Sequence, residues 1–313
     1  MTPTEAQHKI QDLSKLLEQH NYNYYVLDNP TISDYDFDQL LEELMALEKQ
    51  FPEFLSPNSP SQRVGGQITK EFKSVKHQYA MLSLSNSYNQ EDLLDFDRRV
   101  REGLGLASGL REPQSPSALN LFPEEIDYVC ELKFDGLAIS LIYENGKLTQ
   151  AITRGDGVQG DDVTTNAKTI KSIPLQLKGN YPDKFEIRGE VFMPRPVFDA
   201  INKEREEIGD ALMANPRNAA SGSMKMQDSA QTAKRKLDCF LYYVLGENLP
   251  HQSHFDNMHA AKSWGFKISE DAKLCSGINE VIDFINYWAK KRNELPYAID
   301  GIVIKVNGYN QQQ

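Results

Sequence analysis

The fold is decided by residues 128–153, which read YVCELKFDGLAISLIYENGKLTQAIT. Three short runs in this stretch, 128–132, 137–143 and 148–153, are rich in residues that favour β-strands. Asn145-Gly146 lies between the second and third runs, and this dipeptide favours a tight hairpin turn. The stretch therefore predicts an antiparallel sheet.

Further elements are predicted on both sides of this stretch. Residues 185–192, 239–245 and 301–306 have strand patterns. Helices are predicted at 89–104, 196–208, 255–264 and 279–291, and residues 107–124, rich in Ser, Pro and Gly, are expected to form an exposed loop. These patterns predict an α+β fold.

The first 66 residues have a different character. They carry 4 basic and 11 acidic side chains, a net charge of −7, which leaves −4 for the remainder. Two amphipathic helices are predicted, one with a capping box at Thr2 and Glu5 and one that begins after Ser33. An aromatic-rich connection at 22–32 joins them, and the Pro- and Ser-rich residues 52–67 read as a linker. A domain boundary is expected near residue 66.

The composition limits the classes of protein. The 313 residues contain 34 Lys+Arg and 45 Asp+Glu, a formal charge of −11. Such a charge repels polyphosphate at long range, so a basic nucleic-acid coat protein is excluded and a small-molecule enzyme is favoured. With no run approaching ~18 apolar residues and no signal-peptide pattern, we expect a cytoplasmic protein without a membrane partner.

The cysteines also favour a cytoplasmic protein. Cys130, Cys239 and Cys275 show no Cys-x-x-Cys spacing and no paired histidines. This predicts buried, reduced thiols and neither a disulfide framework nor a zinc site within this chain.

Gly155, Gly157 and Gly160 have the spacing of the dinucleotide fingerprint G-x-G-x-x-G. That fingerprint needs a parallel strand before it and an apolar helix after it. Here a hairpin strand precedes the glycines and the polar residues 161–166 follow them. The sequence therefore predicts a glycine-permitted turn, with the cation of Arg154 at a strand end.

Lys133 directly follows the strand run 128–132 and has acidic neighbours at Glu131 and Asp135. A neutral lysine is a capable nucleophile toward phosphorus or carbonyl carbon. Taken alone, the motif is a weak signal and favours an Asp-Gly turn beside a solvated lysine.

Other charged residues strengthen the chemical interpretation. Arg188 and Glu190 lie two apart in a strand and are expected to place two opposite charges on one face of it. Lys305 lies in a β-branched run, where a buried cation without an anionic ligand would be costly. Together with Lys133 and Arg154, these residues predict an anionic, hydroxyl-rich ligand such as a nucleotide.

At this point the sequence resembles a known family, the bacterial NAD-dependent DNA ligases. The resemblance rests on motifs that occur in the family's order: Glu131-Leu132-Lys133-Phe134-Asp135-Gly136, residues 153–157 with 160–164, 188–191, 215–220 and 300–305. Residues 24–25, 34–38, 61–65 and 81–84 also resemble that family, so the likeness covers nearly the whole chain.

The resemblance implies a fold and a reaction. Residues 1–66 would form a small all-helical domain that binds nicotinamide mononucleotide (NMN). Residues 67–313 would form an ATP-grasp-like nucleotidyltransferase domain of antiparallel sheets flanked by helices. Lys133 would attack the adenylyl phosphorus of NAD, release NMN and become lysyl-AMP. The complete enzyme would pass this AMP to a 5′-phosphate at a DNA nick and seal it to the 3′-hydroxyl.

The resemblance also implies residue roles. Lys133, Asp135 and Lys305 would be catalytic, with Lys305 facing the phosphate. The cofactor-binding residues would be Ser83, Leu84 and Glu131 at the adenosine, Arg154 and Glu190 at the ribose, and Tyr24, Tyr25, Asp34 and Asp38 at NMN. Magnesium is expected, with Asp135 and Asp300 as candidate ligands. An aromatic face suits a nicotinamide cation, although acids in a helix's first turn are favourable without any ligand.

The chain departs from the family pattern in several places. Phe37 and Lys225 stand where the family commonly has tyrosine and arginine. The chain is expected to be an N-terminal part that stops before the last lysine motif, the OB-fold, the zinc region and most of the DNA-binding surface. The expected partners are therefore NAD and, through the longer enzyme, nicked duplex DNA, with the chain as a monomer.

Two other functions remain open. An ATP-dependent ligase or a capping-type nucleotidyltransferase would share the lysine motif but not the helical segment 24–38. A nucleotide-binding scaffold without chemistry would not depend on Lys133.

Overall fold

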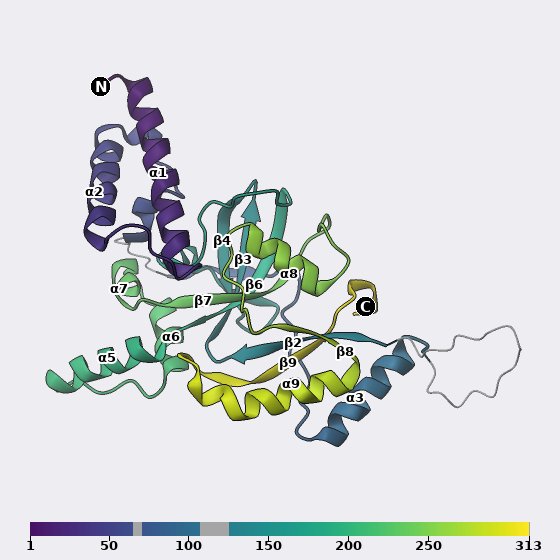
Figure 1. Cartoon of the computed structure of the whole chain (residues 1–313). Coiled ribbons are helices and arrows are strands. Elements are labelled where there is room, and N and C mark those ends of the chain that lie inside the picture. Colours follow the sequence, from purple (N-terminus) through teal and green to yellow (C-terminus); the bar gives the residue numbers. More distant parts are fainter. Residues whose placement is uncertain (65–70, 107–124, 313) are drawn as a thin grey trace, which may run out of the picture.

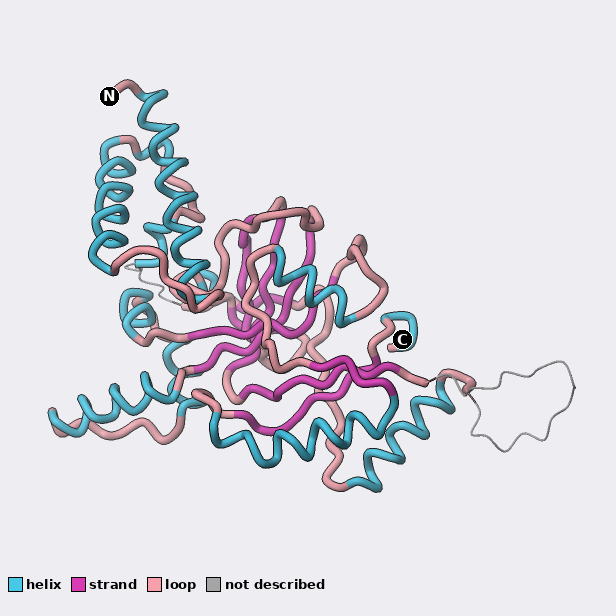
Figure 2. The backbone as a smooth tube through the Cα atoms, in the orientation of Figure 1, coloured by secondary structure: helices cyan, strands magenta, loops and turns pink. Residues whose placement is uncertain are grey.

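The computed structural model describes residues 1–64, 71–106 and 125–312. It confirms the predicted α+β class: a helical N-terminal region is followed by antiparallel sheets flanked by helices (Figures 1 and 2). The helices are α1 (Pro3–Tyr25), α2 (Asp34–Gln50), α3 (Gln90–Gly103), α4 (Thr164–Ala167), α5 (Arg195–Glu207), α6 (Pro216–Met224), α7 (Ser229–Lys234), α8 (His254–Ser263) and α9 (Gly277–Lys291). The strands are β1 (Ser74–Lys76), β2 (Asp127–Phe134), β3 (Leu137–Glu144), β4 (Lys147–Thr153), β5 (Gln159–Asp161), β6 (Lys184–Phe192), β7 (Asp238–Leu245), β8 (Lys273–Ser276) and β9 (Ile299–Val306).

Within the described residues, the strands form three antiparallel sheets, with the orders β4-β3-β6-β7, β8-β2-β9 and β1-β5. The predicted hairpin is confirmed between β3 and β4, where Asn145 and Gly146 have φ values of 50° and 73°. Positive φ at both positions is what a type I′ turn requires. The short elements α4, α6, α7, β1, β5 and β8 were not predicted.

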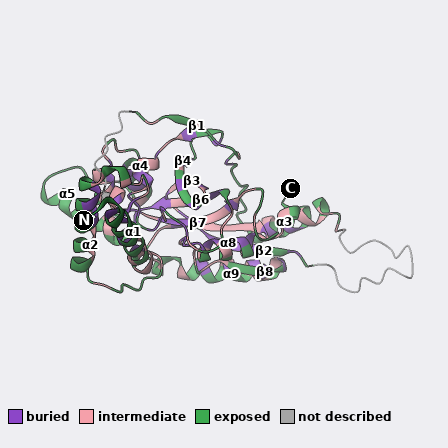
Figure 3. Cartoon of the chain, turned by 90° about the horizontal axis from the view of Figure 1, so that it is seen from above, coloured by how far each residue is buried: buried purple, intermediate pink, exposed green. Residues whose placement is uncertain are grey.

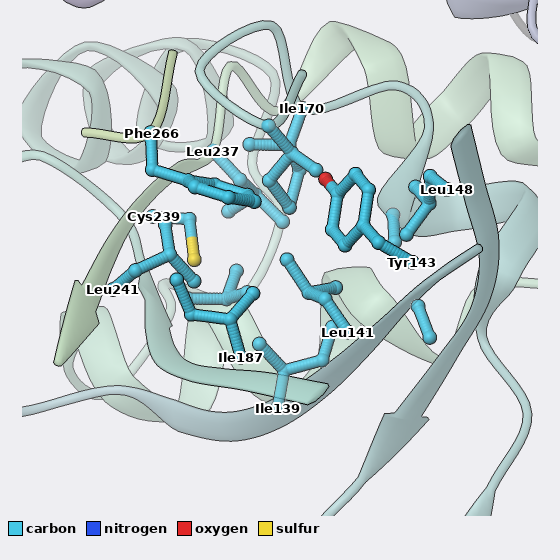
Figure 4. Close-up of a cluster of buried hydrophobic side chains, with 14 of the residues drawn as sticks. Ile139, Leu141, Tyr143, Leu148, Ile170, Ile187, Leu237, Cys239, Leu241 and Phe266 are labelled. Carbon is cyan, nitrogen blue, oxygen red and sulfur yellow. The ribbon is translucent and has the colours of Figure 1, made fainter. Parts of the chain in front are cut away.

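One face of the four-stranded sheet carries the largest core. Ile139, Leu141, Ile187 and Leu241 project from its strands into this cluster (Figure 4). Helices α4, α6 and α8 cover the cluster with side chains such as Ala167, Met224 and Met258. This packing leaves the opposite face of the sheet available for polar residues.

A second core lies between the three-stranded sheet and helices α3 and α9. Tyr128, Cys130, Leu132 and Phe134 alternate along β2 and belong to this core. Because neighbouring strand residues point to opposite faces, Val129, Glu131 and Lys133 share the other face. The predicted reduced thiols are confirmed, since all three cysteines are buried and free.

A stack of aromatic rings joins the two larger sheets. Phe134 of β2 lies 6.2 Å from Phe192 of β6 and 4.5 Å from Phe240 of β7, measured between ring centroids. Tyr297 contacts all three rings edge-on at 5.3–5.5 Å. The stack begins one residue after Lys133 and so fixes the end of β2 against the neighbouring sheet.

The helical region has its own small core, built from Ile10, Leu13 and Leu17 of α1 and Leu44 and Leu47 of α2. The predicted capping box at Thr2 is confirmed, as is the cap at Ser33. Helix α1 continues to Tyr25, so the connection to α2 begins later than the predicted residue 22.

The expectation of a simple linker at 52–67 is wrong for the part that is described. Pro52–Phe54 and Pro60–Val64 form 3₁₀-helices. Arg63 is only 4% exposed, pairs with Glu18 of α1 at 3.2 Å, and donates to the carbonyl oxygens of Ile170 and Ile173 at 2.9 Å each. This segment therefore fastens the helical pair to the sheets. The loop predicted at 107–124 lies outside the described residues.

Figure 3 shows buried residues concentrated in the sheet region, while the helical pair and α5 present mostly exposed or half-buried residues. Helix α5 has no buried residue at all. Charged residues such as Lys133 of β2 and Glu190 of β6 lie where the two larger sheets meet.

Candidate active site

Lys133 lies near the end of β2, and its side chain is 47% exposed. Its ammonium forms an ion pair with Asp300 of β9, and this hydrogen bond lowers the pKa of the Asp300 carboxyl. The register between β2 and β9 shifts at Lys133/Phe134, where the strands pass an irregularity. Lys133 and Asp300, which both lie at strand ends, are thus brought together by the pairing of β2 with β9.

The turn after Lys133 is pressed against β6. A Cβ atom on Gly136 would lie 2.1 Å from the Val191 carbonyl oxygen, so only glycine fits there. Asp135 accepts a hydrogen bond from Arg217 Nη1 at 3.0 Å. Arg217 comes from the first turn of α6, which is capped by Asn215.

Glu190 of β6 lies beside this turn. Burial raises the pKa of Glu190 to about 7, although a hydrogen bond from the Gly136 backbone and the charges of Arg217, Lys133 and Arg154 oppose the shift. The structure therefore brings Lys133, Arg154 and Glu190 into one electrostatic neighbourhood. A carboxyl group that titrates near neutrality among several cations is typical of a functional site.

Glu131 and Lys305 form a second charged group with His254 of α8. Glu131 Oε2 lies 2.6 Å from Lys305 Nζ, and Glu131 Oε1 lies 2.8 Å from His254 Nε2. Burial would raise the pKa of Glu131, but Lys305 and His254 outweigh it and lower the value to about 2. Lys305 also donates to the Tyr242 carbonyl at 2.9 Å. The anionic partner that Lys305 was expected to need in a ligand is present within the chain.

Arg188 forms its ion pair with Glu186 and not with Glu190. Its guanidinium binds Glu186 at 2.7 Å and donates to the carbonyl oxygens of Tyr79 and Ala80 at 2.6 and 3.1 Å. These contacts anchor the start of the segment that carries Ser83 and Leu84, both of which are exposed.

Tyr24, Tyr25, Asp34 and Asp38 gather around a different cation, Lys171, in the segment after α4. Lys171 Nζ lies 5.2 Å from the centre of the Tyr25 ring and 5.8 Å from that of Phe37. Burial lowers the pKa of Lys171, as does Arg63, whereas the charges of Asp38, Asp34 and Tyr24 act in the opposite direction. The phenyl ring of Phe37 thus faces a cation without the hydroxyl of a tyrosine.

The glycine-rich segment is a turn between β4 and β5, as predicted. Gly155 and Gly157 have φ values of 57° and 93°. A Cβ atom on Gly160 would lie 1.7 Å from the Thr153 carbonyl oxygen. Arg154 is exposed at the start of this turn, and its backbone amide donates to Ala138.

Sequence reasoning assigned no role to Arg217, His254 or Lys171. Arg217 lies in the quoted motif 215–220, so its motif was visible although its contact was not. His254 and Lys171 lie in no quoted motif, and each reaches its partners through tertiary packing.

Within residues 1–64, 71–106 and 125–312, no cluster of three or more His, Cys, Asp or Glu side chains could hold a metal ion. Asp135 and Asp300 are each paired with a cation instead. None of the helices in this described part combines the length and the apolar character needed to cross a membrane.

Two family models match the amino-acid sequence of this chain. Residues 69–313 match the model of the NAD-dependent DNA ligase adenylation domain, and residues 3–65 match that of the DNA ligase-like N-terminal NAD⁺-binding domain. The chain therefore belongs to the NAD-dependent DNA ligase adenylation domain family.

Similar proteins named DNA ligase include one from Flavobacterium psychrophilum, 54% identical over 304 residues, covering 97% of this chain and 43% of the relative. Another, from Flavobacterium johnsoniae, is 53% identical over 307 residues, covering 98% of this chain and 43% of the relative. A third, from Cytophaga hutchinsonii, is 50% identical over 313 residues, covering 100% of this chain and 44% of the relative. The chain thus spans less than half the length of these relatives.

Proposed function

We propose that this chain transfers AMP from NAD to Lys133, as the first step of DNA ligation. The observation that carries the proposal is the exposed Lys133 ammonium, paired with Asp300 and next to the carboxyl group of Glu190. Membership in the NAD-dependent DNA ligase adenylation domain family supports NAD as the nucleotide that donates AMP.

Asp300 orients the Lys133 side chain. Lys133 Nζ loses a proton to solvent, and the freed lone pair attacks the adenylyl phosphorus. A nitrogen–phosphorus bond forms, the bond from this phosphorus to the bridging oxygen breaks, and NMN leaves with that oxygen. The nitrogen then loses a second proton to solvent, which leaves a neutral phosphoramide link. Lys305 faces the phosphate and compensates the charge that develops on its oxygens. Asp135 holds Arg217 beside the same group.

The remaining roles follow the same proposal. Glu131, Ser83 and Leu84 border the adenosine, and Arg154 and Glu190 hold the ribose. Tyr24, Tyr25, Asp34 and Asp38 bind the nicotinamide half. The contacts of Lys171 support this last role, since they demonstrate that the same aromatic and acidic groups accommodate a cation.

The division into a helical domain (1–66) and an adenylation domain (67–313) is part of the proposal. The two separate family matches, 3–65 and 69–313, support it.

Magnesium enters the proposal as an ion that accompanies the pyrophosphate of NAD. Mg²⁺ is commonly held by one or two carboxylates together with substrate phosphates, and Asp135 and Asp300 are the carboxylates beside Lys133 that fit this pattern. When bound, the ion would neutralise phosphate charge.

The later chemistry concerns the longer protein. We propose that a longer enzyme, as a cytoplasmic monomer, passes the AMP to the 5′-phosphate of nicked duplex DNA. Any zinc site and most of the DNA contacts would then lie in other regions. The relatives named DNA ligase support this reading.

Intact-mass spectrometry after exposure to NAD and Mg²⁺ tests the proposal. The expected result is a mass gain of one AMP in the wild-type chain and none in Lys133→Ala or Lys133→Arg. The arginine variant is the matched control because it keeps the charge that Asp300 pairs with. Labelling by ATP in place of NAD would instead favour an ATP-dependent nucleotidyltransferase, and an unchanged adduct in Lys133→Ala would remove Lys133 from the mechanism.

A further inference from the structure

His254 is fully buried at the start of α8, and no part of the proposed mechanism uses it. Its Nε2 atom lies 2.8 Å from Glu131 Oε1 and 3.5 Å from Lys305 Nζ. Its Nδ1 atom is buried and has no hydrogen-bond partner among the described residues. The ring is 5.3 Å from that of Tyr243, between centroids.

These contacts decide where the proton of His254 lies. A proton on Nδ1 would be a buried donor without an acceptor, and it would leave two lone pairs, on Nε2 and Oε1, facing each other. A doubly protonated ring would also expose its charge to Lys305. The neutral ring with its proton on Nε2 therefore satisfies the site best, and His254 donates to Glu131.

We propose that His254 is a positioning residue for the adenylation reaction: it holds Glu131 in the orientation in which Glu131 in turn holds Lys305. This inference rests on the proposed function of Lys305 and Glu131. Each oxygen of the Glu131 carboxylate has its own partner, His254 on α8 for one and Lys305 on β9 for the other. Without the hydrogen bond from His254, Glu131 Oε1 becomes a buried acceptor with no donor. Rotation of the carboxylate toward another donor then becomes favourable.

The consequence falls on Lys305. Its side chain is 13% exposed, and its ammonium is held by Glu131 Oε2 and the Tyr242 carbonyl. If the Glu131 carboxylate rotates, the contact between Lys305 Nζ and Glu131 Oε2 is lost. The ammonium then leaves the position from which it would face the phosphate. His254 thus affects the reaction although it need not touch the nucleotide.

Two variants separate this role from simple packing. His254→Gln keeps an N–H donor at similar reach, whereas His254→Leu keeps apolar bulk and removes the donor. The measurement is the single-turnover rate of Lys133 adenylation at increasing NAD concentration, followed by intact mass. Melting temperatures verify that both variants are folded.

The leucine variant is expected to lower the maximal rate by about 10- to 100-fold, the range seen when a partner that orients a metal ligand is removed. The NAD concentration at half-maximal rate should change much less, because Lys305 is assigned to the reacting phosphate. The glutamine variant should recover most of the rate. Equal rates for the leucine variant and the wild type, or equal impairment of both variants, would overturn the proposal.

A crystal structure of His254→Leu provides a readout that does not depend on adenylation. If the proposal is right, the Glu131 carboxylate rotates and its 2.6 Å contact with Lys305 is lost. An unchanged Glu131–Lys305 pair refutes it. A wild-type chain that takes up no AMP would count against the proposed function alone, and the crystal structure would still decide the role of His254.

Discussion

At the scale of single residues, cations near the site are already paired with carboxylates inside the chain. Lys133 pairs with Asp300, Arg217 with Asp135, and Lys305 with Glu131. A phosphate that binds here would exchange one anionic partner for another, which avoids holding an unpaired, desolvated cation in the free protein. Glu190 differs, because burial dominates its environment and raises its pKa to about 7.

The raised pKa of Glu190 predicts that the stability of the protein depends on pH. Its folded pKa of about 7 lies above the ordinary value of 4.5, so the folded state binds the extra proton between these values. The contribution of this group to the free energy of unfolding is thus complete at low pH and is lost as the pH rises through 7. Glu190→Gln removes the charged form, so its melting temperature should exceed that of the wild type at about pH 8 and approach it at about pH 5.

Thermal unfolding at several pH values measures this difference. Asp156→Asn is a suitable control, because that exposed carboxylate has a lowered pKa and receives backbone hydrogen bonds from Val158 and Gln159. A difference for Glu190→Gln that stays constant with pH would contradict the assignment.

The limits of sequence reasoning are also clearest at single residues. Lys133 and Arg154 could be predicted because both belong to motifs that resemble the family, whereas the lysine motif alone is a weak signal. His254 was not, since its partner Glu131 lies 123 residues away and only the packing of α8 brings them together. The ion-pair partner of Arg188 could not be predicted for a similar reason: Glu186 and Glu190 are both two residues away, and the sequence does not distinguish them.

At the scale of elements, local patterns predicted most strands and helices but not how the strands divide into sheets. β2 and β3 are neighbours in sequence yet belong to different sheets, because β2 pairs with β9 from the end of the chain. Such long-range pairing leaves no local signal. Short elements such as β1 and β5 stabilise each other only through pairing, and they were missed for the same reason.

The turn between β4 and β5 predicts contrasting effects for two glycines. Gly160→Ala would place a Cβ atom 1.7 Å from a backbone oxygen, so the backbone must move, at a cost of about 3 kcal/mol or more. Gly222→Ala in α6 meets no atom within 4 Å and should stabilise the protein by about 0.5 kcal/mol through helix propensity. Denaturant unfolding compares the two, and equal stabilities would argue against a packing role for Gly160.

Arg63 predicts how firmly the 3₁₀-helix Pro60–Val64 fastens the helical pair. Arg63→Ala leaves Glu18 and two carbonyl groups without their donor, which should destabilise the protein by about 3 kcal/mol. Arg205→Ala removes a more exposed arginine, whose ion pair spans 3.8 Å and whose Nε donates to the Ala211 carbonyl oxygen at 2.6 Å, and it should cost only about 1 kcal/mol. Thermal unfolding with limited proteolysis measures both, and similar losses in the two variants would show that Arg63 has no special fastening role.

At the scale of the whole molecule, the helical pair and the sheet region meet around Lys171. Its ammonium lies against the Tyr25 and Phe37 rings and near the carboxylates of Asp34 and Asp38. If these groups bind the nicotinamide cation, as proposed, Lys171 competes with it for the same aromatic and acidic surroundings. This arrangement of the two regions was not predictable from local sequence patterns.

This competition predicts the effect of Lys171→Gln. Removing a cation–π partner worth ~1 kcal/mol should strengthen the binding of NMN about fivefold. Isothermal titration calorimetry with NMN measures the change. Lys178→Gln is the matched control, because Lys178 lies over the Tyr22 ring and outside the cluster. Weaker binding of NMN to Lys171→Gln would mean that Lys171 helps to hold the ligand.

The aromatic stack of Phe134, Phe192, Phe240 and Tyr297 limits how the molecule can move. Close-packed rings resist compression and shear, and these four link strands of both larger sheets directly beneath Lys133. The two larger sheets therefore cannot close toward each other when a ligand binds. Any enclosure of the nucleotide has to come from parts of the protein outside this stack, because the stack holds the two larger sheets at a fixed separation where they meet.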